Sequence, residues 1–425
     1  MQTSFTDAQL KDADTASSNA VLRKCVHCGF CTATCPTYLL LGDELDSPRG
    51  RIYLMKDMLE QGGAPAPSTV KHIDRCLSCL SCMTTCPSGV NYMHLVDHAR
   101  AHIEDHYTRP LPERMLRSLL ATVLPNRALF RVAAALGRLA RPLAPLMPGR
   151  LKGMLTMAPA RLPARGRVSG PGTYAAEGAR TARMALLYGC VQPVLRPSID
   201  DAAVRLLNRH GVEVVVASGG GCCGALPHHM GKSADAHALA KVNIAAWEAE
   251  MARGLDAIII TASGCGTTVK DYGFMFRDDP EWAERAARVS ALARDISEVL
   301  ADLDLLPPVI EPGMPVAYHS ACSMQHGQQI RTQPRALLAR AGFAVREVGE
   351  GHICCGSAGT YSILQPELSQ QLRARKLGNI AATGAEIVAT GNIGCITHLE
   401  GGGARMIHTV ELLDWATGGP RPAGV

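Results

Sequence analysis

Two copies of one cysteine pattern constrain this chain more than any other feature of its sequence. The segment CVHCGFCTATCP runs from Cys25 to Pro36, and CLSCLSCMTTCP runs from Cys76 to Pro87 with the same spacing. In a C-x2-C-x2-C-x3-C-P run, three closely spaced thiolates hold one iron–sulfur cubane and the fourth ligates the neighbouring one. The motif therefore comes in pairs, because each copy completes the cluster of the other.

We expect this pair to hold two 4Fe-4S clusters with exchanged ligands. Cluster one takes Cys25, Cys28, Cys31 and Cys86, and cluster two takes Cys76, Cys79, Cys82 and Cys35. Structural zinc is the alternative, but a zinc site closes with four ligands in two separated pairs, which the duplicated run does not match. His27, inside the first motif, is expected beside the cluster or at the surface rather than among its ligands.

The residues around the two motifs have helical periodicity. RGRIYLMKDMLEQ has apolar residues at helical spacing and ends at glycines, and VNYMHLVDHARAHIEDHY continues after the second motif with a similar pattern. A further helix is expected before the first motif. These features predict a helical ferredoxin-type domain over residues 1–110, with two cubanes suited to one-electron transfer.

A basic segment follows this domain. Arg114 to Ala176 contains eleven Lys or Arg and no Asp or Glu. RALFRVAAALGRLARPLAPLMPGRLKGML predicts a basic amphipathic helix, and APARLPARGRVSGPG predicts a linker with a domain boundary near residue 165. We expect residues 111–180 to contact an anionic membrane surface or an acidic partner, with packing on its own domain as the alternative. No nucleic-acid motif accompanies the charge, so no nucleic acid is expected as a partner.

The remaining eight cysteines form a second repeat. Cys190, Cys222, Cys223 and Cys265 are followed, at offsets of 132 or 130 positions, by Cys322, Cys354, Cys355 and Cys395. Such a constant offset indicates two copies of one domain, which we place at residues 181–310 and 311–425.

Each copy has the same order of patterns. Apolar or β-branched runs precede the cysteines, as in RMALLYGC and LDAIIITASGC, and helical patterns such as SIDDAAVRLLNRHG and PRALLARAG lie between them. Strand–helix–strand repetition predicts an α/β fold with a parallel sheet in each copy. The cysteines would then converge at the carboxyl edge of the sheets, where α/β proteins bind ligands.

Three interpretations of these eight cysteines stay open. They hold a third cluster or metal site, they form a redox-active thiol site, or they are inert core residues, as single buried cysteines often are. His398, three residues after Cys395, is the better histidine candidate for a ligand. His228, His229 and His319 are expected to be ordinary loop histidines.

The compartment follows from the cysteine content and the first residues. Sixteen cysteines in 425 residues suggest disulfides or metal sites, and MQTSFTDAQLKDADTASSNA lacks the basic start and apolar core of a secretory signal. We therefore expect a reducing cytoplasm, in which the cysteines bind metal. No uninterrupted apolar run reaches the length of a bilayer span, so a membrane would be contacted at its surface.

The chain resembles the iron–sulfur subunits of membrane-associated respiratory dehydrogenases, which combine a double ferredoxin motif with two CCG domains. These include the iron–sulfur subunit of anaerobic glycerol-3-phosphate dehydrogenase, the lactate-utilisation proteins and the heterodisulfide reductase subunits. More narrowly, GDELDSPRGRIYL, TASGCG and CCGSAGTYS are similar to the iron–sulfur subunit of bacterial glycolate oxidase, the F subunit. This resemblance extends from near Ala20 to the C-terminus.

The resemblance implies an electron-transfer subunit of an oxidoreductase complex. FAD-binding subunits would oxidise glycolate to glyoxylate, with D-lactate as a further substrate, and this chain would pass the electrons to a quinone. It would be cytoplasmic and peripherally associated with the inner membrane. The sequence has no dinucleotide fingerprint and no acid–base constellation for proton abstraction, so we expect the flavin and the catalytic residues on other chains.

Other functions are compatible with the same motifs. The nearest alternative is the corresponding subunit of a lactate or glycerol-3-phosphate dehydrogenase, and further alternatives are a thiol–disulfide reductase that uses the CCG cysteines and an iron–sulfur sensor. One departure bears on the CCG domains. In heterodisulfide reductases the CCG pattern ends in C-x-x-C and holds a non-cubane cluster, whereas Thr268 and His398 occupy the last position here. A non-cubane cluster with the full ligand set is therefore not expected here, and a third cluster with fewer cysteine ligands, or one that uses His398, is a hypothesis.

Overall fold

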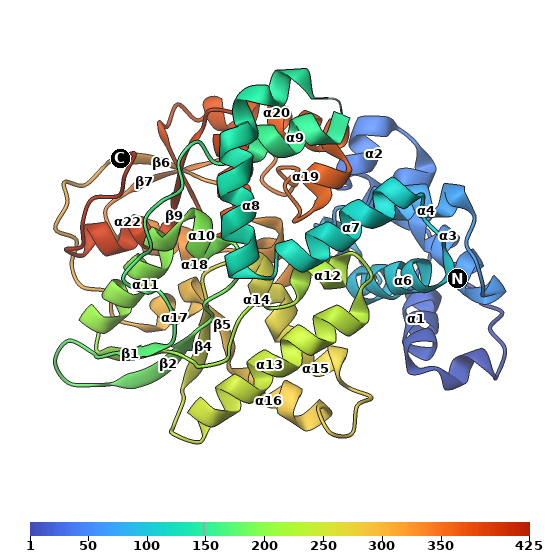
Figure 1. The fold of residues 1–425 in the computed structure, drawn as a ribbon, viewed down its shortest axis with the longest axis horizontal. Coiled ribbons are helices and arrows are strands. Elements are labelled where there is room, and N and C mark those ends of the chain that lie inside the picture. The colour runs from blue at the N-terminus through green and yellow to red at the C-terminus, as the bar shows by residue number, and fades with distance from the viewer. Residues whose placement is uncertain (148) are drawn as a thin grey trace.

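The computed structural model describes residues 1–147 and 149–425. A helical N-terminal module, blue in Figure 1, packs against two α/β units that are built on separate sheets. Helices α7, α8 and α9 lie across the front of the molecule in this view. The predicted α/β class, with a helical N-terminal part and parallel sheets, is confirmed.

The N-terminal module consists of short helices arranged around the two cysteine motifs. Its α-helices are α1 (Ala13–Lys24), α2 (Pro36–Leu41), α3 (Pro48–Gln61), α4 (Pro67–Asp74), α5 (Ser81–Thr85) and α6 (Tyr92–His106), and its 3-10 turns are η1 (Gln9–Lys11), η2 (Phe30–Thr32) and η3 (Glu44–Asp46). The helices predicted before the first motif and after each motif are therefore confirmed as α1, α3 and α6.

Local capping explains where these helices begin. The side chains of Asp12, Ser47 and Asn91 each accept a backbone hydrogen bond in the first turn of α1, α3 and α6. Pro48 follows Ser47 at the first position of α3, where its fixed φ suits a helix and its missing N–H has no intrahelical partner to lose. The apolar faces of the three helices meet in one core that includes the fully buried Leu22.

Each α/β unit has its own sheet. The first sheet has the order β1-β3-β2-β4-β5 and the second has the order β7-β6-β8-β9. The strands are β1 (Gly172–Tyr174), β2 (Ala182–Leu186), β3 (Val212–Val216), β4 (Ala257–Ile260), β5 (Ala293–Asp295), β6 (Pro315–Tyr318), β7 (Ala344–Glu347), β8 (Ile387–Thr390) and β9 (Arg405–His408). Neighbouring strands are parallel except β1, which pairs antiparallel with β3.

The parallel sheet predicted for each copy is thus confirmed. Strand β1 is an addition, contributed by the segment that the sequence predicted to be a linker.

Helices connect successive parallel strands, because a parallel connection has to cross from one end of the sheet to the other. The helices of the first unit are α10 (Gln192–Leu195), α11 (Pro197–Arg209), α12 (Ala225–His229), α13 (Ser233–Met251), α14 (Ser263–Lys270), α15 (Tyr272–Met275), α16 (Ala283–Leu292) and α17 (Ile296–Asp302), of which α17 follows the last strand. The second unit contains the π-helical turn η5 (Ser323–Gly327), α18 (Gln333–Arg340), α19 (Tyr361–Leu364), α20 (Pro366–Ala381), α21 (Ile393–Glu400) and α22 (Thr409–Ala416), of which α22 follows the last strand.

The two units are held together by a shared core and by charged contacts. Buried residues of both sheets belong to one apolar cluster. Asp414 of α22 accepts hydrogen bonds from Arg205 and Arg209 of α11, at 2.6 Å and 3.0 Å. The Ser263 and Ser323 hydroxyls, which begin α14 and η5, are 2.7 Å apart. The cysteine-bearing loops of both units therefore face each other.

The basic segment folds into several elements, which we call the roof helices: α7 (Leu111–Val123), α8 (Arg127–Ala140), the 3-10 helix η4 (Arg141–Leu146) and α9 (Gly149–Met157). The prediction of a single helix over residues 127–155 is wrong, because the structure divides this range among α8, η4 and α9. Its α-helical part ends at Ala140, because Pro142 and Pro145 cannot continue the hydrogen-bond ladder. Over the described residues, no helix alone has the length and apolarity of a membrane span, although α7 and Arg127–Leu146 meet that criterion together as a pair bent by 119°.

Candidate metal centres

The two N-terminal cysteine motifs enclose two small cavities. The first, of about 30 Å³, is lined by Cys25, Cys28, Cys31, Cys82 and Cys86. The second, of about 20 Å³, is lined by Cys35, Cys76, Cys79 and Cys82. The fourth cysteine of each motif thus lies with the triplet of the other, as exchanged ligation requires. A 4Fe-4S cluster needs four thiolate ligands, which each small cavity can supply, and the assignment of each cysteine as a ligand stays a prediction.

The backbones of the two motifs turn in the same way. His27 and Gly29 have φ angles of 54° and 85°, and Ser78 and Leu80, at the same places in the second motif, have 49° and 62°. Left-handed backbone is uncommon outside glycine, so its repetition at matched positions indicates a shared structural demand. The Ser78 N–H donates to the Cys76 sulfur at 3.5 Å. Backbone donors directed at sulfur suit thiolates that share the negative charge of a cluster.

A buried arginine lies beside the second small cavity. Arg51 of α3 is 1% exposed, and its guanidinium lies 3.8 Å from the Cys35 sulfur and 3.1 Å from the Asp46 carboxylate. Burial disfavours its charged form, but Cys76 and the other acidic groups around it raise the pKa of Arg51 above its usual range. Arg51 thus places a fixed positive charge next to the thiols. The sequence motifs around Arg51 did not indicate this position beside a thiol.

A much larger cavity, of about 540 Å³, lies where the roof helices meet both α/β units. We call it the chamber. Cys76 and Cys79 line it as well as the second small cavity. Apolar side chains of α7 and α8, among them Leu120 and Phe130, contribute to its lining. All eight cysteines of the second repeat also line the chamber: Cys190, Cys222, Cys223, Cys265, Cys322, Cys354, Cys355 and Cys395.

These eight cysteines form two groups of four, one from each unit. The first quartet is Cys190, Cys222, Cys223 and Cys265, and the second quartet is Cys322, Cys354, Cys355 and Cys395. Within each quartet, neighbouring thiols shift one another's pKa values, which shows that they lie close together. In the second quartet the Cys355 and Cys395 sulfurs are 3.5 Å apart. In the first, the neighbouring thiols Cys190 and Cys223 lower the pKa of Cys222 to about 4. Clustered sulfur donors of this kind suit a metal centre better than inert packing.

Glycine allows the backbone to reach each quartet. Gly224 and Gly356 have φ angles of 83° and 92°, and their N–H groups donate to the sulfurs of Cys222 and Cys354 at 3.4 Å and 3.5 Å. A Cβ at Gly224 would lie 2.9 Å from a backbone oxygen, and one at Gly356 would lie 2.5 Å from another. The two CCG sequences therefore need glycine for conformation and for space.

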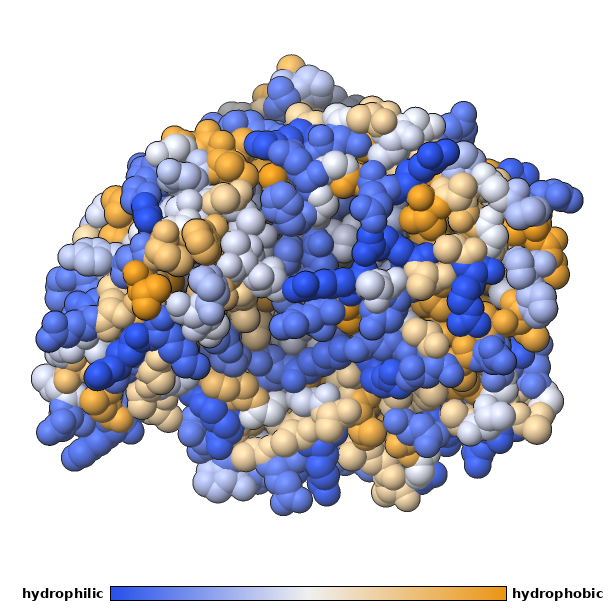
Figure 2. Space-filling model, turned by 180° about the vertical axis from the view of Figure 1, so that it is seen from behind, coloured by the Kyte–Doolittle hydropathy of each residue, from blue (hydrophilic) through white to orange (hydrophobic). Residues whose placement is uncertain are grey.

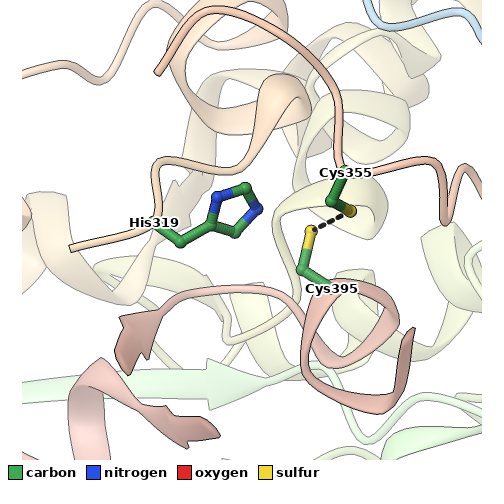
Figure 3. A group of neighbouring side chains, drawn as sticks. All are labelled: His319, Cys355 and Cys395. Atoms are coloured by element: carbon green, nitrogen blue, oxygen red, sulfur yellow. Dashed lines mark hydrogen bonds between the residues drawn. The ribbon is translucent and has the colours of Figure 1, made fainter. Parts of the chain in front are cut away.

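His319 lies against the second quartet. Figure 3 shows its ring pointing towards Cys355 and Cys395, and ligand atoms of the three residues all lie within 4.8 Å of one another. The expectation that His319 is an ordinary loop histidine is therefore wrong. Its position directly after the buried strand β6 was the available signal in the sequence, since ligand residues gather at that end of a parallel sheet.

The other histidines lie in different surroundings. His398 lines the chamber and is buried, with its Nε2 3.4 Å from the Ser369 hydroxyl. His228 and His229 face the Asp97 carboxylate of α6, at 3.3 Å and 3.5 Å. These last two contacts join the N-terminal module to the first α/β unit.

Comparisons with known proteins agree with this arrangement. Residues 21–90 match the 4Fe-4S dicluster domain family, and residues 184–270 and 316–400 match the cysteine-rich domain family known as CCG. A crystal structure of a hypothetical protein from Helicobacter pylori has a TM-score of 0.50 and 11% identity, over 96% of this chain and 73% of that one. This last likeness concerns the fold alone.

Two curated relatives match nearly the whole length of the chain. The chain is 42% identical to the glycolate oxidase iron–sulfur subunit of Escherichia coli strain K12, over 98% of this chain and 99% of that protein. Identity to the probable glycolate oxidase iron–sulfur subunit of Bacillus subtilis strain 168 is 32%, over 93% and 94%. Lactate utilization protein A of Shouchella clausii is 26% identical over 54% of this chain and 95% of its own length. The chain therefore belongs to the family of glycolate oxidase iron–sulfur subunits, which are components of an oxidoreductase complex.

Proposed function

We propose that this chain receives electrons from FAD-binding subunits that oxidise glycolate to glyoxylate, and that it passes them to a quinone at the inner membrane. The relatives that are similar over nearly the whole chain support glycolate as the substrate. The sequence contains no dinucleotide fingerprint, which supports a flavin on partner subunits.

The observation that carries this proposal is a continuous series of thiol-lined cavities. Cys82 lines both small cavities, and Cys79 lines the second small cavity and the chamber. Iron–sulfur clusters bound in these cavities would supply one-electron transfer. The residues of this chain fix the order of the sites, and Arg51 offsets negative charge at the second one. The two quartets are proposed as further cluster sites, with a redox-active thiol site as the alternative.

The chamber suits the proposed acceptor. The roof helices contribute the apolar Leu120, Val123 and Phe130 to its lining, which suits a hydrophobic ring, and the thiols of both quartets line the same cavity. The overall reaction balances: glycolate releases two electrons and two protons as it becomes glyoxylate, and a quinone takes up two of each as it becomes quinol.

The outer surface of the roof helices supports a position on the membrane. Leu139 and Leu146 are 76% and 77% exposed, and Leu136 between the basic residues Arg131 and Arg138 is 61% exposed. Exposed leucines interleaved with arginines are typical of helices that lie at an anionic bilayer surface. Figure 2 shows the opposite face of the molecule, which hydrophilic residues mostly cover. We therefore propose that the roof helices lie on the cytoplasmic side of the inner membrane.

The test uses the complex of this chain with its flavoprotein subunits. We expect glycolate to reduce a short-chain ubiquinone in the presence of this chain, and lactate and glycerol-3-phosphate to be poorer donors. Cys79→Ser should abolish quinone reduction and spare reduction of a dye that accepts electrons directly from the flavin. Equal quinone reduction with wild type and Cys79→Ser would contradict the proposal. A strong preference for lactate or glycerol-3-phosphate would keep the electron route and change the substrate.

A further inference from the structure

The two quartets have different surroundings although their cysteines match. At the repeat offset of 132 positions, His319 corresponds to Leu187, which packs in the apolar core of the first unit. Gly224 approaches Ala236 in the first unit in the same way as Gly356 approaches Ser369 in the second. When the two units are aligned on these contacts, Lys376 corresponds to Asn243. The second quartet is therefore the one with an imidazole and an ammonium group beside it.

His319 has the environment of a ligand rather than of a core residue. Its side chain is 1% exposed, and neither ring nitrogen has a hydrogen-bond partner within the described residues. A buried imidazole normally pairs at least one nitrogen, because an unpaired buried polar group is unfavourable. The groups that it faces are the thiols of Cys355 and Cys395.

Lys376 supplies a positive charge beside the second quartet. It is 1% exposed and donates to the Glu350 carbonyl oxygen at 2.7 Å. Its ammonium group interacts through charge with the second-quartet thiols Cys322, Cys354 and Cys355.

We propose that His319 is a nitrogen ligand, together with Cys355 and Cys395, of an iron–sulfur cluster held by the second quartet. This inference rests on the proposed function, in which the quartets bind clusters. His319 takes the place of the missing second cysteine of the C-x-x-C pattern, and it does so from a different loop than His398.

The proposal makes the two quartets unequal as redox sites. A neutral imidazole in place of a thiolate removes one negative charge from the ligand set, and histidine ligation raises the reduction potential of an iron–sulfur cluster. The ammonium of Lys376 acts in the same direction, whereas Leu187 and Asn243 give the first quartet neither effect. The second quartet is then the site of higher potential, where electrons collect before they reach the acceptor.

The test is pulsed EPR of the full-length chain, purified anaerobically and reconstituted with iron and sulfide, with and without 15N-histidine. We expect one cluster signal to show a strongly coupled nitrogen whose coupling changes with the isotope. His319→Leu, which copies the first repeat, should remove that coupling. The matched control His398→Leu should keep it. His319→Cys should retain the iron and shift the midpoint potential of that signal to a lower value.

The outcomes separate this inference from the proposed function. A signal that depends on Cys354 but shows no histidine nitrogen would overturn His319 as a ligand and leave a cluster in the second quartet. Loss of the coupling in His398→Leu, with retention in His319→Leu, would also overturn it. Zinc in stoichiometric amount at this quartet, or no signal beyond the two N-terminal clusters, would overturn the inference and the proposed cluster sites together.

Discussion

Cys79 and Cys322 pack in the same buried apolar cluster, although they belong to the second N-terminal motif and to the second α/β unit. Burial raises the pKa of the Cys79 thiol well above its usual range, and the neighbouring Cys322 thiol raises it further. Leu77 and Cys354 belong to the same cluster. The N-terminal thiol sites therefore lead directly to the second quartet, which is where we expect electrons to enter the CCG domains.

If the ligands are exchanged, replacing the fourth cysteine of one motif should damage the cluster held by the triplet of the other motif. Cys86→Ser should disturb the cluster at the cavity of Cys25 and Cys28, because Cys86 lines that cavity. Cys35→Ser, the matched variant, should disturb the cluster held by the second triplet. EPR spectra of the reduced proteins distinguish the two signals. The opposite assignment, with Cys86→Ser affecting only the second signal, would show that each motif completes its own cluster.

The glycines of the CCG sequences give a test of the quartets that leaves every thiol in place. Gly356→Ala should lower stability by about 2–3 kcal/mol and cause loss of iron at the second quartet, because the new Cβ meets a backbone oxygen in a left-handed conformation. Gly219→Ala is the control, since Gly219 has a φ of 87° and open space around it. Thermal unfolding and iron content report the result. If both variants lost stability equally, the effect would come from alanine in a left-handed conformation alone, and the lack of space for a Cβ at Gly356 would not contribute.

Much of the fold could be predicted from the sequence, because the signals were local. Runs such as VEVVV and AIII mark buried parallel strands, and the caps of α1, α3 and α6 lie within the chain segments they start. The short strand β1 was missed, since GTY has no pattern of its own and forms a strand only by pairing with β3. The break in the basic segment was missed although Pro142 and Pro145 indicate it.

The candidate site was predictable only in part. Cysteine spacing drew attention to all sixteen thiols, and the structure places them in the linings of the two small cavities and the chamber. Sequence patterns indicated no role for Arg51 and His319, because the role of each depends on residues that are not its neighbours in the chain. Arg51 lies beside Cys35, and His319 lies beside Cys395, only in the folded protein. Spacing carries no information on such long-range contacts.

Asp200 makes stability depend on pH. It is buried under the chamber wall, where Gln192 and Thr261 donate to it, and burial raises its pKa to about 7. Since the unfolded chain ionises nearer pH 4, the folded protein loses stability as pH rises between these values, by up to about 1.4 kcal/mol per unit. Asp200→Asn removes this dependence. The difference in urea midpoint between the variant and the wild type should therefore increase from pH 5 through pH 6 to pH 7. A difference that stays constant over these pH values would contradict the raised pKa of Asp200.

The membrane contact of the roof helices depends on their charge. Replacing Arg131, Arg138 and Arg141 by Glu should weaken binding to vesicles containing anionic lipid by at least about 100-fold, because each basic residue near the surface contributes about 1 kcal/mol. The control replaces three arginines outside the roof helices, Arg253, Arg288 and Arg346, by Glu, so that the net charge changes by the same amount. Vesicle sedimentation with anionic and neutral lipid measures both triples. Equal weakening by the control would mean that overall charge, rather than the roof helices, determines binding.

The central claim is that thiol sites continue from the N-terminal module into the CCG quartets. Iron and acid-labile sulfide per chain, measured after anaerobic purification and paired with EPR of both redox states, test it most directly. We predict clearly more than the roughly eight irons of two cubanes, with an extra signal that disappears in Cys354→Ser. About eight irons, with spectra unchanged by Cys354→Ser, would contradict the claim and leave the quartets without clusters.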